Sequence, residues 1–297
     1  MADLGPDMNW FSPGEFVLGA NLPWIRYGID FGANLWRRDG GVAHPDTREL
    51  LDARLAEVAA TRVSMVRWFL LCDGRAGIRF SQDGKPLGLD KQVLRDLDAA
   101  VNALRRHGLQ VMFVLLDFGW CKRATVVNGV QLGGRHRVLK TRLSREQLLE
   151  NVFRPILERY SSEKAIAAWD VINEPEWVTL GLGTSSPMNS LRRPELRAFI
   201  EETARLIHSV TVQPVTVGSA GSRWRSFYRR LPLDFDQVHW YDSLVKAPPL
   251  ERSVEELGFK RPVLLGEFPV HASERSAEEI LETARAAGYA GAFGWPA

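Results

Sequence analysis

The chain has 297 residues, of which 45% are hydrophobic and 25% charged, a composition typical of a globular protein. The 38 basic and 36 acidic residues leave a formal net charge of +2. This balance argues against a general nucleic-acid binder, because such proteins carry a strong basic excess. No uninterrupted apolar stretch approaches the roughly 18 residues of a spanning helix, so we expect no membrane partner either.

The first residues and the cysteines limit the cellular context. The start, MADLGPDMNW, lacks a charged segment followed by an apolar run, so no signal peptide is predicted. We expect a cytoplasmic protein, or a secreted one whose leader is absent from this chain. Cys72 and Cys121 are too few for a disulfide scaffold, and free thiols are expected, with one bridge as the alternative. A metal site at these cysteines is not expected, since no histidine accompanies them at ligand spacing.

In the first half of the chain, short apolar runs alternate with amphipathic segments. The similar pieces LGANLPW and FGANLW could each begin the first strand, and we place it at 16–22, followed by a long loop over 23–45. In chain order we then predict a helix at 46–60, a strand at 62–71, a helix at 90–108, a strand at 109–117 and a helix at 144–160. Pro155 should kink the last of these helices, because it removes a backbone donor.

The second half continues the alternation. The predicted elements are a strand at 165–173, a helix at 194–210, a strand at 214–220, a short helical piece near 222–230, a strand at 235–241, a helix at 250–259, a strand at 261–268, a helix at 276–288 and a strand at 289–295. Eight nearly continuous apolar strands are typical of a buried parallel sheet. We therefore predict an α/β fold, a (β/α)₈ TIM barrel in one catalytic domain over residues 16–297, with residues 1–15 as an N-terminal arm. A doubly wound open sheet is the alternative, but no glycine-rich phosphate loop follows the first strand.

Polar and aromatic residues collect where the predicted strands end, which is where TIM barrels carry their active groups. Glu174 and Glu267 end the fourth and seventh strands, across the mouth of the barrel. Such a pair can divide the acid and nucleophile roles at the anomeric carbon of a sugar, with the two carboxyls about 5–5.5 Å apart. Because Asn173 and Glu174 are adjacent, both can face one site only if the strand end bulges or twists. Pro175 should bias Glu174 toward an extended backbone.

An ordered set of residues at successive strand ends carries a family resemblance. Its members are Arg67, Asn173-Glu174-Pro175, His239-x-Tyr241, Glu267 and Trp295. This set resembles clan A of the glycoside hydrolases, and within it family five, the cellulase and mannanase family, over residues 16 to 296. The resemblance implies a retaining β-glycosidase acting on β-linked glucan, mannan or related glycosides, with a carbohydrate as partner and no cofactor or metal.

The resemblance also implies roles for individual residues. Glu174 would be the general acid/base and Glu267 the nucleophile. Asn173 would bind the sugar 2-hydroxyl, Tyr241 and Arg67 would orient the nucleophile, and His239 would lie near the acid/base. Trp295 would form the floor of the −1 subsite. The family usually has a histidine after the third strand, where this chain has LLDFGW, so Asp117 or Trp120 is expected to contact the sugar there.

Several features leave alternatives open. Tryptophans can serve as sugar platforms or as packing, and Trp177, with Glu176 beside it, is the best placed of them just beyond Glu174. The basic loop at 122–142 is interpreted as a solvated loop, or as a subsite for an acidic or phosphorylated sugar. Two other functions remain as alternatives, namely a catalytically silent carbohydrate-binding barrel and a barrel acting on phosphorylated or acidic sugars. The sugar, the linkage and the oligomeric state are not predicted.

Overall fold

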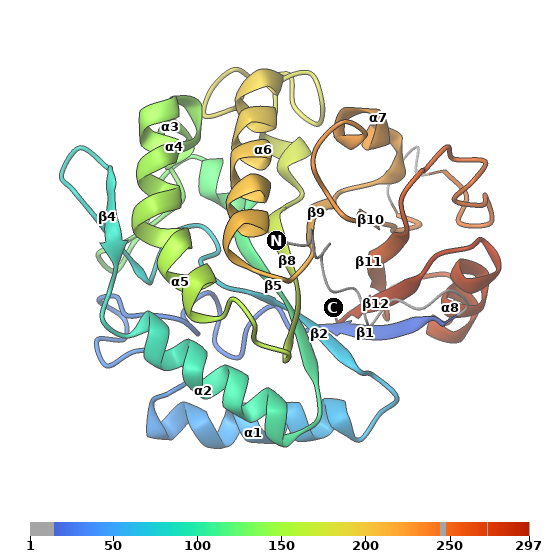
Figure 1. The fold of residues 1–297 in the computed structure, drawn as a ribbon, viewed down its shortest axis with the longest axis horizontal. Helices are drawn as coiled ribbons and strands as arrows, with labels where there is room; N and C mark the ends of the chain where they lie inside the picture. The colour runs from blue at the N-terminus through green and yellow to red at the C-terminus, as the bar shows by residue number, and fades with distance from the viewer. Residues whose placement is uncertain (1–14, 244–247, 272, 297) are drawn as a thin grey trace.

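Eight parallel strands close into a barrel in the order β1-β12-β11-β10-β9-β8-β5-β2, with helices around it (Figure 1). The structure is a computed structural model that describes residues 15–243, 248–271 and 273–296. The barrel strands are β1 (Val17–Asn21), β2 (Met65–Phe69), β5 (Gln110–Asp117), β8 (Ile166–Asn173), β9 (Val215–Ser219), β10 (Asp236–His239), β11 (Val263–Pro269) and β12 (Gly291–Trp295). The predicted single-domain TIM barrel is confirmed, and the predicted arm at 1–15 lies outside the described residues except for Glu15.

Helices cover the outside of the barrel between successive strands. The α-helices are α1 (Pro45–Ala59), α2 (Val93–Arg106), α3 (His136–Lys140), α4 (Arg142–Leu148), α5 (Arg154–Arg159), α6 (Arg193–Val210), α7 (Arg225–Tyr228) and α8 (Ala277–Ala286). Short 3₁₀ turns are η1 (Phe118–Cys121), η3 (Pro175–Val178) and η4 (Ser222–Trp224), and η2 (Leu149–Phe153) is a π-helical turn. None of the helices in the described part of the chain is both long and apolar enough to span a lipid bilayer.

The first strand lies where the LGANLPW piece predicts it, and FGANLW falls in the loop between β1 and α1. The predicted helix at 144–160 is helical up to Arg159, but it is divided into α4, η2 and α5. The π-helical turn η2 ends two residues before Pro155, which has no N–H to donate within the helix.

The predicted helix at 250–259 is wrong, because this segment forms only turns. Ser253 and Glu256 exchange backbone-to-side-chain hydrogen bonds as at a helix start. Gly258 then adopts a positive φ of 77° and ends the turn at once. Ser253 and Glu256 therefore form the capping contacts of a helix start, but no helix follows them.

The barrel interior is apolar at one end and polar in the middle. On β2, Met65 packs inside the barrel with Met112 and Phe293, while Trp68 faces the surrounding helices. Two residues beyond Met65, strand alternation puts the charged side chain of Arg67 into the interior, where none of it is exposed. A polar layer thus lies directly below the carboxyl ends of the strands, where the long loops begin.

Two hairpins extend those loops. The pair β3 (Ile78–Phe80) and β4 (Pro86–Leu89) follows β2, and the pair β6 (Thr125–Val127) and β7 (Val130–Leu132) follows β5. Since β2, β5 and β8 are neighbours in the barrel, the loops that follow them line adjacent parts of its mouth.

Candidate active site

Glu174 is presented by a bulge at the end of β8. The pairing of β8 with β9 slips by one residue between Asp170 and Asn173, which brings Asn173 opposite Gly218. The extra residue breaks the strict alternation, so Asn173 and Glu174 both line the same cavity, as the predicted bulge requires.

The backbone at Glu174 differs from the prediction. Pro175 was expected to hold Glu174 extended, but Glu174 has φ 44° and ψ 48°, the left-handed conformation. Its N–H donates to the carbonyl of Gly218 at 2.7 Å, and its own carbonyl accepts from Trp177 N in the turn that follows. These tertiary hydrogen bonds outweigh the local preference before proline. Such strained positions cost roughly 1–3 kcal/mol and cluster at functional sites.

Glu267 is presented by irregularities on both sides of β11. Its pairing slips against β10 between Val238 and His239, and against β12 between Leu265 and Phe268. The side chain points into the mouth, where Oε1 accepts from Arg67 Nη1 at 2.7 Å and Oε2 accepts from the Tyr241 hydroxyl at 2.8 Å. Both donors were expected around this carboxylate.

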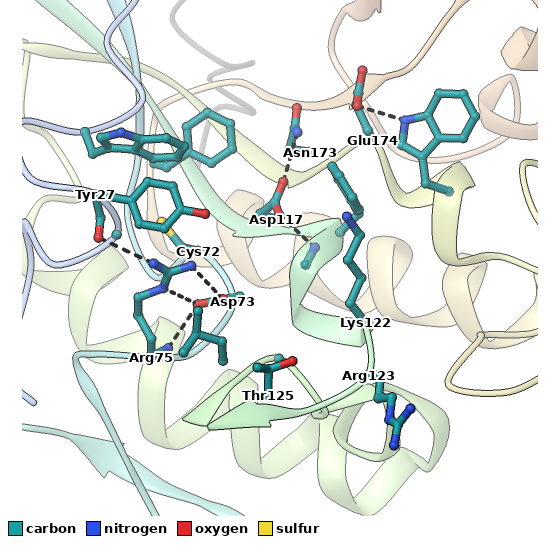
Figure 2. A pocket seen from close by; sticks show the side chains of 18 of the residues that line it. Tyr27, Cys72, Asp73, Arg75, Asp117, Lys122, Arg123, Thr125, Asn173 and Glu174 are labelled. Carbon is teal, nitrogen blue, oxygen red and sulfur yellow. Dashed lines mark hydrogen bonds and ion pairs between the residues drawn. The ribbon is translucent and has the colours of Figure 1, made fainter. Parts of the chain in front are cut away.

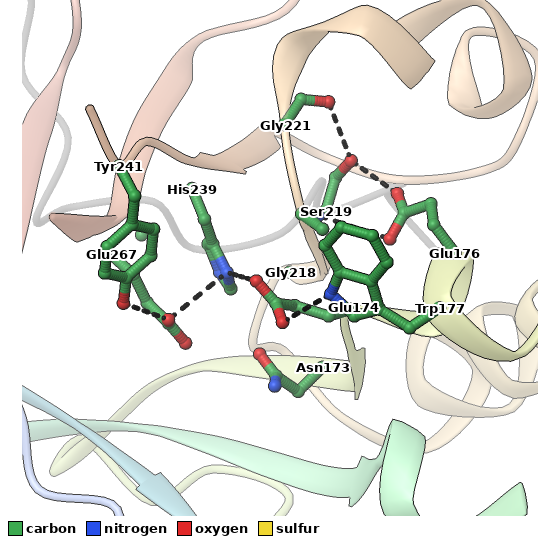
Figure 3. A network of polar contacts seen from close by, with 12 residues as sticks. Asn173, Glu174, Glu176, Trp177, Gly218, Ser219, Gly221, His239, Tyr241 and Glu267 are labelled. Carbon is green, nitrogen blue, oxygen red and sulfur yellow. Dashed lines mark hydrogen bonds and ion pairs between the residues drawn. The ribbon is translucent and has the colours of Figure 1, made fainter. Parts of the chain in front are cut away.

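The two glutamates lie close together, with His239 between them (Figure 3). The Nδ1 atom of His239 is 2.8 Å from Glu174 Oε1 and 3.4 Å from Glu267 Oε2. One carboxylate oxygen of each glutamate and an imidazole nitrogen all lie within 4.8 Å of one another. A retaining glycosidase needs carboxyls about 5–5.5 Å apart, and an inverting one needs about 6.5–9.5 Å. The spacing therefore corresponds to the retaining geometry.

Arg67 connects the polar layer of the barrel. Its Nε and Nη2 atoms donate to Asp170 Oδ2 at 3.1 and 2.8 Å, and Nη2 also donates to Asn173 Oδ1 at 2.7 Å. A third contact runs from Nη1 to Asn21 Oδ1 at 3.1 Å. Sequence reasoning missed Asp170 and Asn21. The sequence nevertheless contained a clue to Asp170. It is the one acidic residue in the apolar run AIAAWDVIN, and Arg67 is the one basic residue in the apolar run MVRWFLL, so the two could have been expected to pair inside the barrel.

Asp117 holds the amide of Asn173 in place. Asn173 Nδ2 donates to Asp117 Oδ2 at 3.0 Å, while Arg67 donates to the amide oxygen, so both ends of the amide are fixed. Burial raises the pKa of Asp117 to about 6, although hydrogen bonds from Asn173 and Gly119 oppose the shift. Asp117 thus occupies the strand end where the family usually has a histidine, and it lines the cavity.

The glutamates open into a cavity of about 740 Å³ (Figure 2). Trp177 and Trp295 line it, as predicted, together with Tyr241. Trp177 also donates from Nε1 to Glu174 Oε2 at 2.8 Å. The wall also contains Trp24, a candidate sugar platform, and Lys122 of the basic loop, together with residues that sequence reasoning did not assign, namely Tyr27, Phe69, Cys72, Asp73 and Arg75. Cys72 and Cys121 are both buried and free, as expected.

Trp120 is not at the site, and its predicted contact with the sugar is wrong. Its side chain is fully buried in the core between barrel and helices, and Nε1 donates to the carbonyl of Arg135 at 3.1 Å. The 3₁₀ turn η1 that follows Asp117 rotates the chain, so the indole three residues on points away from the mouth.

Glu176 is also turned away from the cavity (Figure 3). It is fully buried behind the loop, where it accepts hydrogen bonds from the hydroxyls of Ser219 and Tyr228, both at 2.6 Å. Burial raises its pKa to about 7. Its position is that of a loop anchor.

Burial raises the pKa of both facing glutamates, but their partners differ. At Glu267, the contacts of Arg67 and Tyr241 favour the ionised form and oppose the effect of burial. Glu174 has the indole of Trp177 and the imidazole of His239 as direct partners and no cation in contact. Burial lowers the pKa of His239 to about 4, so the imidazole is neutral at pH 7. The donors around the two carboxyls therefore differ, with a cation in direct contact only at Glu267.

A metal ion could find ligands only within this same group among the described residues. Glu174, His239 and Glu267 each offer one ligand atom within 4.8 Å of the others. Two of these residues are carboxylates with hydrogen-bond donors from indole, phenol and guanidinium groups, and these donors compete with a cation for the same oxygens.

The fold and the site together define the class of the protein. A closed parallel barrel that carries facing glutamates at the ends of its fourth and seventh strands, with carboxylate oxygens within 4.8 Å of each other, has the architecture and the carboxyl spacing of a retaining glycoside hydrolase.

Comparisons with known proteins narrow this class. The chain is 25% identical, over 332 aligned positions, to a mannan endo-1,4-beta-mannosidase of Mytilus edulis, with 98% of this chain and 86% of the relative covered. Its fold matches the structure of the beta-mannanase from the blue mussel Mytilus edulis with TM-score 0.76 and 23% identity, covering 95% of this chain and 86% of that one. The endo-1,4-beta-mannanase of Eisenia fetida matches with TM-score 0.79 and 22% identity, covering 96% and 86%. No family model matches the chain. The chain is therefore similar to mannanases in sequence and in fold, over nearly its whole length.

Proposed function

We propose that the protein hydrolyses the internal β-1,4 bonds of mannan with retention of configuration, with Glu267 as nucleophile and Glu174 as acid/base. The observation that carries this proposal is the pair of carboxylates within 4.8 Å of each other at the floor of an open cavity. This spacing is shorter than the roughly 6.5–9.5 Å that leaves room for the attacking water of an inverting enzyme, whereas direct attack on a sugar ring fits.

The nucleophile is assigned from its partners. Glu267 accepts from a guanidinium and a phenol, which stabilise its negative charge and fix the orientation of both oxygens. A carboxylate that is ionised and held in place can attack the anomeric carbon without losing rotational freedom at that moment.

Glu174 is assigned as the acid because its direct partners differ from those of Glu267. Glu174 is buried and lacks a direct cationic partner, so it retains a proton near neutral pH more readily than Glu267 does. When Glu267 becomes esterified to the sugar, its negative charge disappears. The pKa of Glu174 then falls, because the repulsion between the two carboxylates is removed.

The reaction follows as two displacements. Glu267 attacks the anomeric carbon while Glu174 gives its proton to the leaving oxygen, and a glycosyl-enzyme ester forms. Glu174, now ionised, takes a proton from water, and that water cleaves the ester and restores both carboxyls. Asn173, fixed by Arg67 and Asp117, is positioned to hydrogen-bond the 2-hydroxyl as charge develops on the ring.

The choice of mannan comes from the relatives. The curated proteins that match are named mannan endo-1,4-beta-mannosidases, and one is matched over almost the whole of this chain. A cavity open along the barrel mouth, with Trp24, Trp177 and Trp295 in its wall, suits stacking on several sugars of a polymer.

Azide rescue tests the two roles. On an aryl β-mannoside with a good leaving group, we expect Glu267→Ala and Glu174→Ala each to lose at least about 10³-fold in kcat. Azide should restore turnover in both variants but with opposite products, the α-mannosyl azide from Glu267→Ala and the β-mannosyl azide from Glu174→Ala, as read by NMR. The buried Glu176→Gln variant is the control and should need no rescue. Azides of the reverse configuration would exchange the assigned roles, and no rescue in either variant would contradict them.

A polymer screen tests the substrate. We expect reducing ends to appear with a rapid fall in viscosity on β-1,4-mannan, and at least about tenfold less release on β-1,4-glucan. Release of single sugars without a fall in viscosity would contradict internal cleavage.

A further inference from the structure

A second hollow lies beside the candidate active site on the same face of the barrel. This groove has a volume of about 980 Å³, near the upper end of the range for ligand sites. The loops after β2, β5 and β8 form its walls. It is not part of the catalytic mechanism described above.

The hairpin β6–β7 separates the groove from the catalytic cavity. Thr125 and Leu132, which face each other across the hairpin, line the catalytic cavity, whereas Gln131, one residue along, lines the groove. Arg123 lines both hollows. Figure 2 shows it beyond Lys122, on the side away from Glu174. A polymer in the cleft can therefore extend a branch past Arg123 into the groove.

The groove is rich in positive charge that lacks counter-ions. Arg123, Arg135 and Arg137 line it, and none of them pairs with an acidic side chain in the described parts of the chain. One acid, Asp83, also lines the groove, but its carboxylate is held by Lys85 at 2.7 Å. Arg154 and Arg159 on α5, by contrast, each have an acidic partner.

The guanidinium of Arg135 stacks on an aromatic ring, and its buried Nε atom has no hydrogen-bond partner among the described residues. Its guanidinium carbon lies 3.4 Å from the centre of the Phe80 ring, which fixes the plane of the group. Arg135 Nε and the neighbouring His136 Nδ1 are both buried and unpaired among the described residues. Buried polar atoms without partners are uncommon and usually point to a missing ligand or water.

We propose that this groove, defined by Arg123, Arg135, His136 and Arg137, binds a negatively charged substituent on the sugar chain, a carboxylate or a sulfate ester. A planar, positioned guanidinium suits such oxyanions, because it donates two parallel hydrogen bonds to them. The proposal rests on the proposed function, since the neutral backbone of the polymer would occupy the catalytic cavity. It identifies the substrate as a mannan that carries acidic groups.

The test compares three polymers from one source: neutral mannan, the same mannan oxidised at a few C6 positions to carboxylates, and the same mannan lightly sulfated. We expect kcat/KM on a charged polymer to exceed that on neutral mannan by about tenfold at low salt, and the advantage to shrink at about 0.5 M salt as the charges are screened. Whichever charged polymer shows the advantage identifies the anion.

Two variants locate the effect. Arg137→Gln, at an exposed position, should reduce the charged-to-neutral ratio of kcat/KM severalfold. Arg135→Gln should reduce it further, because the stacked guanidinium is lost. The control is the double variant Arg62→Gln/Lys164→Gln, which removes two exposed charges before β2 and β8, at the opposite end of the barrel. Its ratio should equal that of the unaltered protein.

Binding is measured separately by retardation in native gels that contain each polymer. Stronger retardation by a charged polymer that depends on Arg137 supports the groove, even if no polymer is cleaved and the proposed function fails. Cleavage of neutral mannan with no preference for either charged polymer would overturn the groove proposal and leave the proposed function intact. A ratio that changes equally in the control double variant would also overturn it.

Discussion

The contacts of single residues decide which glutamate carries the proton. Burial raises the pKa of both Glu174 and Glu267, whose nearest carboxylate oxygens lie within 4.8 Å of each other, so burial alone does not distinguish them. The difference comes from donors. Arg67 and Tyr241 contact Glu267, while an indole and a neutral imidazole contact Glu174. Sequence reasoning singled out all of these residues, but their pairing depends on distances.

Removing one donor should move the pH dependence of the reaction. In Tyr241→Phe, Glu267 loses a hydrogen bond that stabilises its ionised form, so its pKa rises. We expect the acidic limb of the profile of kcat/KM against pH to shift to higher pH, and kcat to fall by about 10- to 100-fold. Tyr160→Phe is the control, because Tyr160 bonds Asp98 on the outer helices, and its profile should not move. A fall in kcat without a shift of the limb would indicate a purely steric role.

At the scale of elements, strand irregularities and glycines create the site. The slips in register at the ends of β8 and β11 place each glutamate in the mouth. Gly218 on β9 lies against the polar layer, where a Cβ atom would be 2.6 Å from Arg67 Nη2 and 3.0 Å from Asp170 Oδ2. A side chain there would displace the guanidinium that orients both Asn173 and Glu267.

Gly218→Ala should therefore destabilise the protein and impair catalysis together. We expect the free energy of unfolding in urea to fall by about 1–3 kcal/mol, the usual cost of overpacking. We expect kcat on mannan to fall by at least about tenfold because Arg67 shifts. Gly221→Ala is the matched control three residues along the chain, where the nearest atom to an added Cβ is 3.7 Å away. An unchanged kcat in Gly218→Ala would show that the position of Arg67 is not critical.

At the scale of the whole molecule, several buried acids make stability depend on pH. Burial raises the pKa of Asp30 to about 6 and that of Glu176 to about 7. A carboxyl with a raised pKa in the folded state stabilises that state below its unfolded pKa, and this contribution is lost as pH rises through the folded value. His239, with its pKa lowered to about 4, has the opposite effect, since the unfolded state binds its proton at higher pH.

A variant of Glu176 tests this dependence of folding stability on pH. Its shift from 4.5 to about 7 corresponds to about 3 kcal/mol lost between pH 4.5 and pH 8. The difference in unfolding free energy between the unaltered protein and Glu176→Gln should therefore decrease by about that amount over this range, since all other groups titrate in both proteins. A constant difference for Glu176→Gln would mean that Glu176 does not titrate in the range.

The sequence by itself determined the barrel and most of its functional strand ends. Apolar strands alternating with amphipathic helices leave few ways to bury both faces of a sheet, so the eight strands could be placed closely. Pro155 and the helix start predicted at 276 likewise depend on local sequence, and the structure has a π-helical turn just before the former and a capping box at the latter.

The tertiary structure alone decided how side chains group around the site. Trp120 and Glu176 stand next to site residues in the chain, yet short 3₁₀ turns direct both into the core. Glu174 adopts a left-handed backbone in which its N–H donates to the carbonyl of Gly218 on β9, against its local preference. Asp170 joins Arg67 across the barrel, 103 positions along the chain. Such contacts depend on register and loop path, which neighbouring residues in a sequence do not encode.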